Sequence, residues 1–219
     1  MQLPFSVEQF FGVFRDYNTS LWPAQVFLVG LALMTLAFVF YPRRWSGAVI
    51  SAILAFLWAW LGLAYHLAFF TAINPLAYGF SAVSLAGAAL FFWQGVVCRR
   101  LEFRGARSAR TVAGLVLIAF ALLVYPAWSM AVGHSYPAIP TFGVPCPTTI
   151  FTIGLLCLAV APYPRSPLVV PVVWCFIGAQ AVFLLDVPPD TGVIAAGVAG
   201  VVLLARAKVA IKPGATISG

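Results

Sequence analysis

Seven apolar segments, separated by short stretches of polar and turn-forming residues, dominate the pattern along the chain. Most of them hold about 20 residues, and an α-helix of that length crosses the roughly 30 Å hydrocarbon core of a bilayer. The pattern therefore predicts an all-α membrane protein, a seven-transmembrane helix bundle. The predicted spans cover residues 21–41, 45–70, 76–97, 111–132, 147–161, 167–185 and 191–205.

The segment before the first span mixes apolar and charged residues at helical spacing. Ser6 is followed three residues later by Gln9, a pair typical of a helix-capping box. Phenylalanine and valine side chains then alternate with charged ones up to Asp16, which predicts a short amphipathic helix lying in the membrane interface. An ordinary helical extension of the first span is the alternative.

The distribution of basic residues predicts the orientation. If the chain crosses the membrane seven times, eleven of its twelve Lys and Arg residues fall on one side and only Arg15 on the other. Cytoplasmic loops are enriched in basic residues, so we expect an extracytoplasmic N-terminus and a cytoplasmic C-terminus. The chain then divides into an extracytoplasmic segment (1–20), a transmembrane domain (21–206) and a cytoplasmic tail (207–219). The eleven residues are Arg43, Arg44, Arg99, Arg100, Arg104, Arg107, Arg110, Arg165, Arg206, Lys208 and Lys212.

The composition agrees with a lipid bilayer as the solvent. The chain is 63% hydrophobic and only 8% charged, whereas a soluble domain carries about 25% charged residues. The basic residues behind the net charge of +7 lie between the apolar runs. They therefore indicate the orientation of the chain in the membrane and not a nucleic-acid partner. The four cysteines form no CxxC pair, which argues against a zinc ribbon or a thioredoxin-type motif.

Four reactive side chains are predicted to lie near the outer boundary of the membrane. They are His66, His134, Cys146 and Asp190, which a rise of about 1.5 Å per residue puts roughly 24–36 Å from the basic end of their spans. Ionisable residues at such a depth are candidates for function. Histidine, cysteine and aspartate are also suitable ligands for zinc or copper.

The fifth span is short, because only 14 residues separate Pro147 from Pro162, about 21 Å of helix. We therefore expect residues 141–147 to dip below the outer surface as a re-entrant loop that roofs a polar pocket. Irregular backbone survives at that depth only where protein covers it or it lines a watery cavity. A thinned or tilted bilayer is the alternative.

These features lead to the hypothesis that the protein binds or handles a metal ion or a small ligand in a polar pocket at the extracytoplasmic face. The metal ligands would be His66, His134, Cys146 and Asp190. No two of them have HxxxH or CxxC spacing, so the fold would have to bring them together. Further candidates for contacts with a small ligand are Asn74, Tyr136, Thr148 and Asp186.

A zinc- or thiol-dependent intramembrane enzyme is one alternative. Cys146 precedes Pro147 at a predicted helix start, where a thiol pKa is lowered, and His134 could serve as its base. The topology is similar to that of zinc-dependent ceramidase-like hydrolases, but those use three histidines and this chain has two. A transporter or sensor subunit without catalysis is the other alternative. A retinal photoreceptor is excluded because the last span has no lysine in its middle.

Three stretches resemble an uncharacterised bacterial family of small multi-spanning membrane proteins. They read LPFSVEQFFGVFRDYN, HLAFFTAINP and GHSYPAIPTFGVPCPTTIFTIG. The resemblance implies a protein of the bacterial inner membrane. Apart from the resemblance, the expected partners are the lipid bilayer, a small ligand or metal ion, and a second copy of the chain in a homo-oligomer. The resemblance implies no activity, cofactor or catalytic residue.

Overall fold

The computed structural model describes residues 4–207 of the chain. Residues 1–3 and 208–219 lie outside this description, and with them Lys208 and Lys212 of the predicted cytoplasmic tail. Within the described residues the secondary structure is helical, and extended pairing is limited to two isolated bridges. The predicted all-α class is therefore confirmed.

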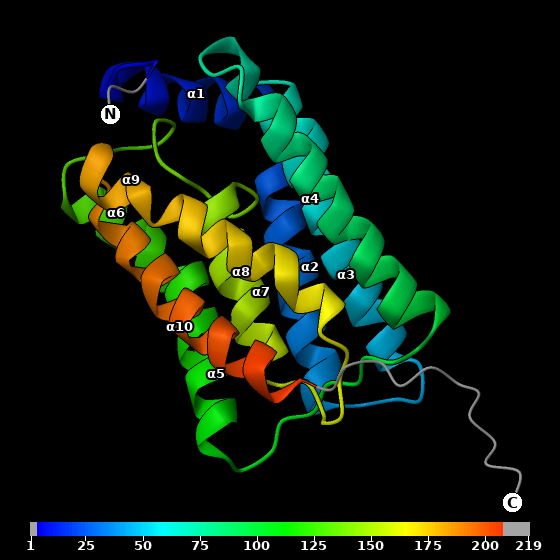
Figure 1. The fold of residues 1–219 in the computed structure, drawn as a ribbon. Coiled ribbons are helices and arrows are strands. Elements are labelled where there is room, and N and C mark those ends of the chain that lie inside the picture. The colour runs from blue at the N-terminus through cyan, green and yellow to red at the C-terminus, as the bar shows by residue number, and fades with distance from the viewer. Residues whose placement is uncertain (1–3, 208–219) are drawn as a thin grey trace, which may run out of the picture.

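The helices follow the apolar segments in order and run side by side, except for the first, which lies across one end of the bundle (Figure 1). Three stretches adopt the rare π-helical geometry, which often marks functional sites. The elements are α1 (Val7–Ser20), α2 (Ala24–Phe40), α3 (Ser46–Trp60), the π-helix η1 (Leu61–Leu67), the 3₁₀ turn η2 (Phe70–Ala72), α4 (Ala77–Phe91), the π-helix η3 (Phe92–Val97), α5 (Ala109–Ala119), the π-helix η4 (Phe120–Val124), α6 (Tyr125–Ala131), α7 (Pro145–Leu156), α8 (Ser166–Gly178), α9 (Gln180–Leu184), the 3₁₀ turn η5 (Pro188–Asp190) and α10 (Thr191–Arg206).

Five helical stretches of the described chain are long and apolar enough to cross a membrane, and a sixth is added if α1 and α2 are taken as one broken span. The five are Ser46–Ala72, Ala77–Val97, Ala109–Ala131, Ser166–Leu184 and Pro188–Arg206. Each of the seven predicted segments contains a helix, but α7 has only 12 residues. Length and composition thus identify five or six spans, where the sequence pattern predicted seven.

The predicted amphipathic helix is present as α1, and it meets α2 at an angle of 87°. Its capping box forms as expected: the Gln9 amide donates to Ser6 Oγ (3.2 Å), and the Ser6 amide donates to Gln9 Oε1 (2.8 Å). Phe11, Phe14 and Tyr17 lie on its buried face. This face covers the end of the bundle that holds the loop 133–144 (Figure 1).

The short helix α7 occupies the centre of the bundle, where it packs against α5, α8 and α10. Every residue of α7 except Cys146 is buried. It meets α5 at two glycines, because a Cβ added to Gly114 would lie 2.5 Å from the carbonyl oxygen of Gly154. Small residues at this crossing allow the two backbones to approach closely.

Protein covers the irregular segment that leads into α7. Phe142, Gly143, Val144 and Pro145 are all buried, although they precede or begin the helix. Of the two conditions named for such a stretch, cover by protein is the one met here. The depth of the stretch in a membrane stays a prediction.

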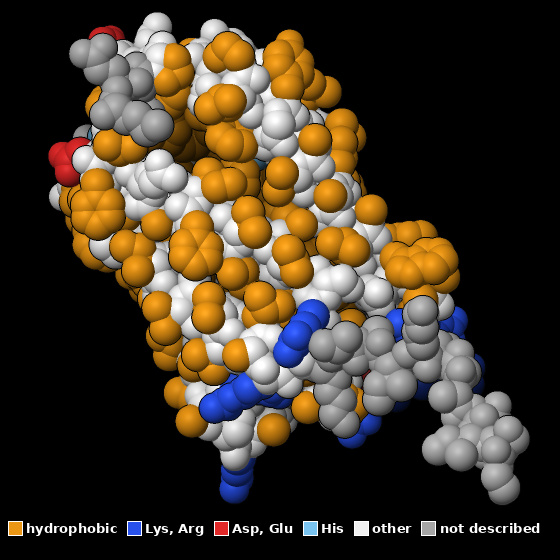
Figure 2. All heavy atoms as spheres, in the orientation of Figure 1, with side chains coloured by type: hydrophobic (Ala, Val, Ile, Leu, Met, Phe, Trp, Pro, Cys, Tyr) orange, Lys and Arg blue, Asp and Glu red, His pale blue; other side chains and the backbone are white. Residues whose placement is uncertain are grey.

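The two ends of the bundle differ in charge. Figure 2 shows the Lys and Arg side chains of this face gathered at the end opposite α1, and acidic side chains near α1. Long apolar stretches separate the two groups, which is the distribution expected of a protein whose basic loops face one side of a membrane. We call these the basic end and the α1 end.

Candidate ligand site at the α1 end

Asn18, at the end of α1, fixes the loop 133–144 beneath that helix. Its side chain is fully buried, and Nδ2 donates to the carbonyl oxygens of Pro137 (2.7 Å) and Ile139 (2.8 Å). Its Oδ1 accepts from Thr141 Oγ1 (2.7 Å) and from Gln25 Nε2 (3.3 Å). Because one amide joins α1, α2 and the loop, these three parts hold a single arrangement.

Tyr17 makes the next tie between α1 and the loop. Its hydroxyl accepts from Trp60 Nε1 (2.7 Å) and donates to the carbonyl oxygen of Gly143 (3.3 Å). Burial raises the pKa of Tyr17 and outweighs the opposite effect of the Trp60 bond, so the hydroxyl stays a donor. Gly143 has φ +105°, and a Cβ there would lie 2.3 Å from Leu28 Cδ1, so only glycine fits.

His66 lies at the centre of a group of aromatic rings. The imidazole is 1% exposed and is carried by the π-helix η1. The ring centroids of Trp174, Phe80 and Phe70 lie 4.9, 5.7 and 6.2 Å from that of His66, and Tyr65 lies 5.3 Å away. Neither ring nitrogen of His66 has a hydrogen-bond partner among the described residues. We call Phe14, Tyr65, Phe70, Phe80 and Trp174 the aromatic cluster.

Trp174 of α8 joins this cluster to Cys146 of α7. Its Nε1 is buried and, like the His66 nitrogens, has no partner within the described chain. A Cβ added to Gly178 would lie 3.7 Å from Trp174 Nε1 and 3.5 Å from Cys146 Sγ. The indole nitrogen and the thiol therefore lie on either side of the same point beside Gly178.

A buried carboxyl group lies on the other side of Cys146. The Tyr125 hydroxyl donates to Asp190 Oδ1 at 2.5 Å, and both residues are 1% exposed. The Cys146 side chain lies beside the Asp190 carboxyl, and Tyr65 is close enough to both for electrostatic interaction. Tyr65 also contacts the His66 ring, with centroids 5.3 Å apart. We call Tyr125, Cys146 and Asp190 the carboxyl cluster.

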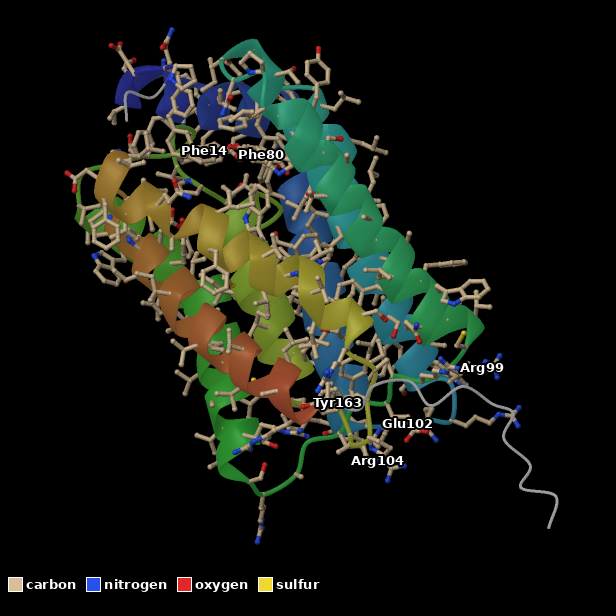
Figure 3. All side chains as sticks on the ribbon, in the orientation of Figure 1. Phe14, Phe80, Arg99, Glu102, Arg104 and Tyr163 are labelled. Carbon is tan, nitrogen blue, oxygen red and sulfur yellow. The ribbon has the colours of Figure 1, made fainter. Side chains whose placement is uncertain are left out.

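The surface is hollowed directly below α1, between it and the adjacent ends of α8 and α9, and hydrophobic side chains line this hollow (Figure 2). Figure 3 shows Phe14 of α1 and Phe80 of α4 in the space between α1 and the bundle. Phe14 stacks on Tyr65 (6.0 Å), and Phe80 meets Trp174 edge-on (5.4 Å). The aromatic cluster therefore extends from the underside of α1 to His66.

The four residues expected to bind a metal are not brought together as one group. Cys146 and Asp190 are neighbours, whereas His66 lies among aromatic rings and His134 stacks on Phe11 with centroids 3.9 Å apart. Within the part of the chain that the structure describes, no group of three or more His, Cys, Asp or Glu side chains could hold a metal ion. The metal site stays a prediction. The sequence suggested His134 as the base next to the Cys146 thiol, but the residue beside this thiol is Asp190.

Three of the four candidates for ligand contacts (Asn74, Tyr136 and Thr148) make hydrogen bonds within the fold. The Asn74 Oδ1 accepts from the amide of Leu76 (3.0 Å) in the turn before α4, and the Tyr136 hydroxyl donates to the carbonyl oxygen of Asn18 (3.4 Å). Thr148 is buried in α7, and its Oγ1 accepts from the amide of Gly143 (3.2 Å). Asp186 is exposed and has φ +50°. These contacts hold the turns around the site.

Sequence reasoning missed Trp174, Tyr125 and Gly178. Trp174 and Gly178 lie four residues apart on one face of α8, and Tyr125 directly follows η4. A tryptophan in a predicted span is usually packed in the core or at the interface, so its residue type alone carried no signal. The π-helix η1, in which Tyr65 and His66 are buried, has no simple sequence pattern.

Residues 7–213 match the profile of a family of unknown function, DUF6064. The chain belongs to this family. The expected resemblance to an uncharacterised family is confirmed, and the bacterial origin that it implied stays a prediction. No curated protein matches the DUF6064 chain, and no solved structure matches it.

Proposed function

We propose that the protein is a multi-pass membrane protein that binds a small, neutral ligand in the hollow at the α1 end, with His66 and Trp174 as its polar contacts. The aromatic cluster would hold the apolar body of the ligand. This is the small-ligand form of the hypothesis drawn from the sequence. A metal ion is the less favoured form, because only two of its four expected ligands are neighbours.

The observation that carries this proposal is the pair of unpartnered ring systems. Both nitrogens of His66 and the Nε1 of Trp174 are buried without a hydrogen-bond partner among the described residues. A buried polar group without a partner costs about 1–3 kcal/mol. Such a cost is kept at binding sites, where a ligand supplies the missing partner.

The chemistry of the two side chains defines the ligand. An indole N–H is only a donor, and a neutral imidazole offers one donor and one acceptor. An oxygen acceptor such as a carbonyl would accept from both rings. The five rings of the aromatic cluster favour a flat, apolar body. A neutral ligand of this kind dissolves in the hydrocarbon region and can reach the hollow from the bilayer.

The proposed setting is the bacterial inner membrane, crossed seven times, with the α1 end extracytoplasmic. The charge difference between the two ends supports this orientation. The count of seven requires α2 and α7 to be counted as spans. The hollow would then open toward the extracytoplasmic side.

The experiment compares the molecules that copurify with the protein. Wild type, His66→Phe and Trp174→Phe are extracted in mild detergent from the membranes in which the protein is naturally made, and small molecules released by organic solvent are identified by mass spectrometry. Trp93→Phe is the matched control, because Trp93 is 58% exposed. We expect a neutral, carbonyl-bearing molecule with wild type and the control, and its loss from the other two variants.

Thermal unfolding in detergent separates binding from folding. Without ligand, replacing His66 or Trp174 by phenylalanine removes unpartnered polar atoms, so stability should be unchanged or higher. The same set of copurifying molecules in all four proteins would contradict the proposal. A clear loss of stability in ligand-free His66→Phe would show that the imidazole serves the fold.

A further inference from the structure

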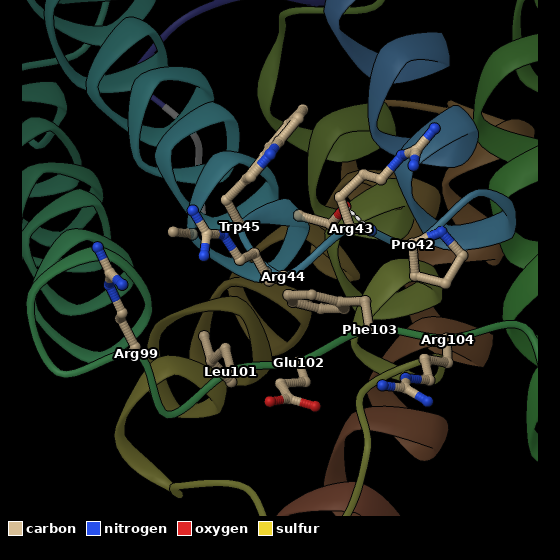
Figure 4. Close-up of a pocket in the computed structure, with 12 residues that line it drawn as sticks. Pro42, Arg43, Arg44, Trp45, Arg99, Leu101, Glu102, Phe103 and Arg104 are labelled. Carbon is tan, nitrogen blue, oxygen red and sulfur yellow. Dashed lines mark hydrogen bonds between the residues drawn. The ribbon is translucent and has the colours of Figure 1, made fainter.

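The basic end holds a pocket of about 460 Å³. It lies where the turn between α2 and α3 meets the segment that follows η3 (Figure 4). The residues that line it are Pro42, Arg43, Arg44, Trp45, Ser46, Gly47, Ala48, Arg99, Leu101, Glu102, Phe103 and Arg104. Nothing in the proposed function uses this pocket.

Close backbone packing builds its floor. A Cβ added to Gly47 of α3 would lie 2.3 Å from the carbonyl oxygen of Leu101, so the segment rests directly on the helix. The same segment pairs with the chain after α7 through a bridge between Phe103 and Ala159. Leu101 and Phe103 are each 2% exposed, while Glu102 and Arg104 between and after them face outward. The pocket is therefore part of the fold.

The lining is strongly cationic. Four of the lining residues are arginines, and Glu102 is the one carboxylate among them. Figure 4 shows the Arg44 and Arg99 side chains on one side of the pocket, with Glu102 and Arg104 along the extended segment. Arginine presents a planar fork of N–H donors that matches the oxygens of a phosphate.

Arg99 has an unfavourable backbone conformation. Its φ is +50°, in the left-handed region where glycine is common and a residue with a Cβ pays about 1 kcal/mol or more. The chain thus places an arginine where a glycine would be more stable. Strain of this kind persists where the side chain is needed.

Exposed aromatic residues lie near the pocket at the basic end of the bundle. Trp45 lines the pocket and is 47% exposed, Tyr41 is 77% exposed, and Trp93 is 58% exposed. Tryptophan and tyrosine gather at the depth of lipid headgroups in membrane proteins. A basic pocket at this depth is suited to an anionic headgroup.

We propose that this pocket binds a phosphate group, which Arg44, Arg99 and Arg104 hold through charge-assisted hydrogen bonds. The phosphate belongs either to an anionic phospholipid of the adjacent leaflet or to a free anion. Trp45 would lie against the glycerol region of a lipid.

The experiment measures thermal unfolding of the purified protein in a neutral detergent. Phosphatidylglycerol, phosphatidylcholine or inorganic phosphate is added in turn. A ligand that binds only the folded state raises the unfolding midpoint, and the stabilisation grows with the logarithm of the ligand concentration over its dissociation constant. We compare wild type with Arg44→Gln, Arg99→Gly and the control Arg107→Gln, which removes the same charge outside the pocket.

We expect phosphatidylglycerol to stabilise wild type and Arg107→Gln, and its apparent dissociation constant to rise about tenfold or more in Arg44→Gln and Arg99→Gly. Stabilisation by inorganic phosphate at equal concentration identifies a free anion as the ligand, and stabilisation by phosphatidylglycerol alone identifies a lipid. With phosphatidylcholine alone, Arg99→Gly should unfold at or above the wild-type temperature.

Two results would overturn the proposal. One is that phosphatidylglycerol and inorganic phosphate stabilise wild type no more than phosphatidylcholine does. The other is that Arg107→Gln weakens binding as much as the pocket variants, because the effect would then come from the overall charge of the basic end.

Discussion

Gly178 offers a sharp test of the ligand site. A single methyl group added at Gly178 would fill the space beside Trp174 Nε1 without disturbing the fold. The Cβ of Gly178→Ala would lie 3.4 Å from Val193 Cγ1, 3.5 Å from Cys146 Sγ and 3.7 Å from Trp174 Nε1. These are ordinary van der Waals distances, so no neighbour has to move. The methyl would occupy the space between the indole nitrogen and the thiol.

Two effects of opposite sign are expected. Alanine is favoured over glycine in a helix by up to about 1 kcal/mol, and Gly178 is the last residue of α8, so a gain of about 0.5 kcal/mol is expected. The ligand would lose its hydrogen bond to Trp174, which weakens binding about tenfold or more. The variant should be at least as stable as wild type and yet lose its ligand.

The assay combines detergent thermal unfolding with mass spectrometry of the released small molecules. Gly30→Ala is the matched control, since Gly30 lies within α2 and a Cβ there meets nothing within 4 Å. It should gain similar stability and keep the ligand. If Gly178→Ala retains the ligand at the wild-type level, the space beside Trp174 is not the binding site and the reasoning fails.

Three further predictions follow from the packing and the proposed orientation. Asn18→Asp should lower the free energy of unfolding by about 3 kcal/mol or more, because a carboxylate oxygen would replace the amide that donates to the buried carbonyl oxygens of Pro137 and Ile139. An unchanged midpoint of thermal unfolding would contradict the role of this amide. Gly114→Ala should cost about 3 kcal/mol or more, because its Cβ would lie 2.5 Å from the Gly154 carbonyl oxygen. Gly79→Ala, within α4 and with nothing within 4 Å of its Cβ, should instead gain up to about 1 kcal/mol. In intact cells a membrane-impermeant maleimide should label Tyr136→Cys but should reach Cys98 only after lysis, and the reverse pattern would invert the orientation.

The local hydrophobic pattern predicted the helices well, because the length and apolar character of each segment are enough to indicate a helix within an apolar environment. The capping box between Ser6 and Gln9 was also readable, since its two partners are three residues apart. The crowding of polar residues at the α1 end was expected from helix rise alone, and Cys146 and Asp190 are indeed neighbours there.

Pairings between distant segments were not readable. The Tyr125–Asp190 bond joins residues 65 positions apart, and the Asn18 bonds to the loop span about twice that separation. Tertiary packing decides such contacts, and residue type only narrows the choice. For the same reason the sequence placed both histidines in one site. In the structure His66, within η1, lies among the rings of the aromatic cluster, and His134 stacks on Phe11 of α1.

The short helix α7 connects the two candidate sites. Its 12 residues span about 18 Å, less than a bilayer core, and a lipid-facing helix of that length would leave backbone groups exposed to hydrocarbon. Here Gly143 donates to Thr148 Oγ1 at one end, and the Phe103–Ala159 bridge holds the chain at the other. Because protein covers both ends, α7 does not have to match the bilayer. At one end the cover comes from the loop beneath α1, next to the proposed ligand site, and at the other from the segment that forms the floor of the basic pocket.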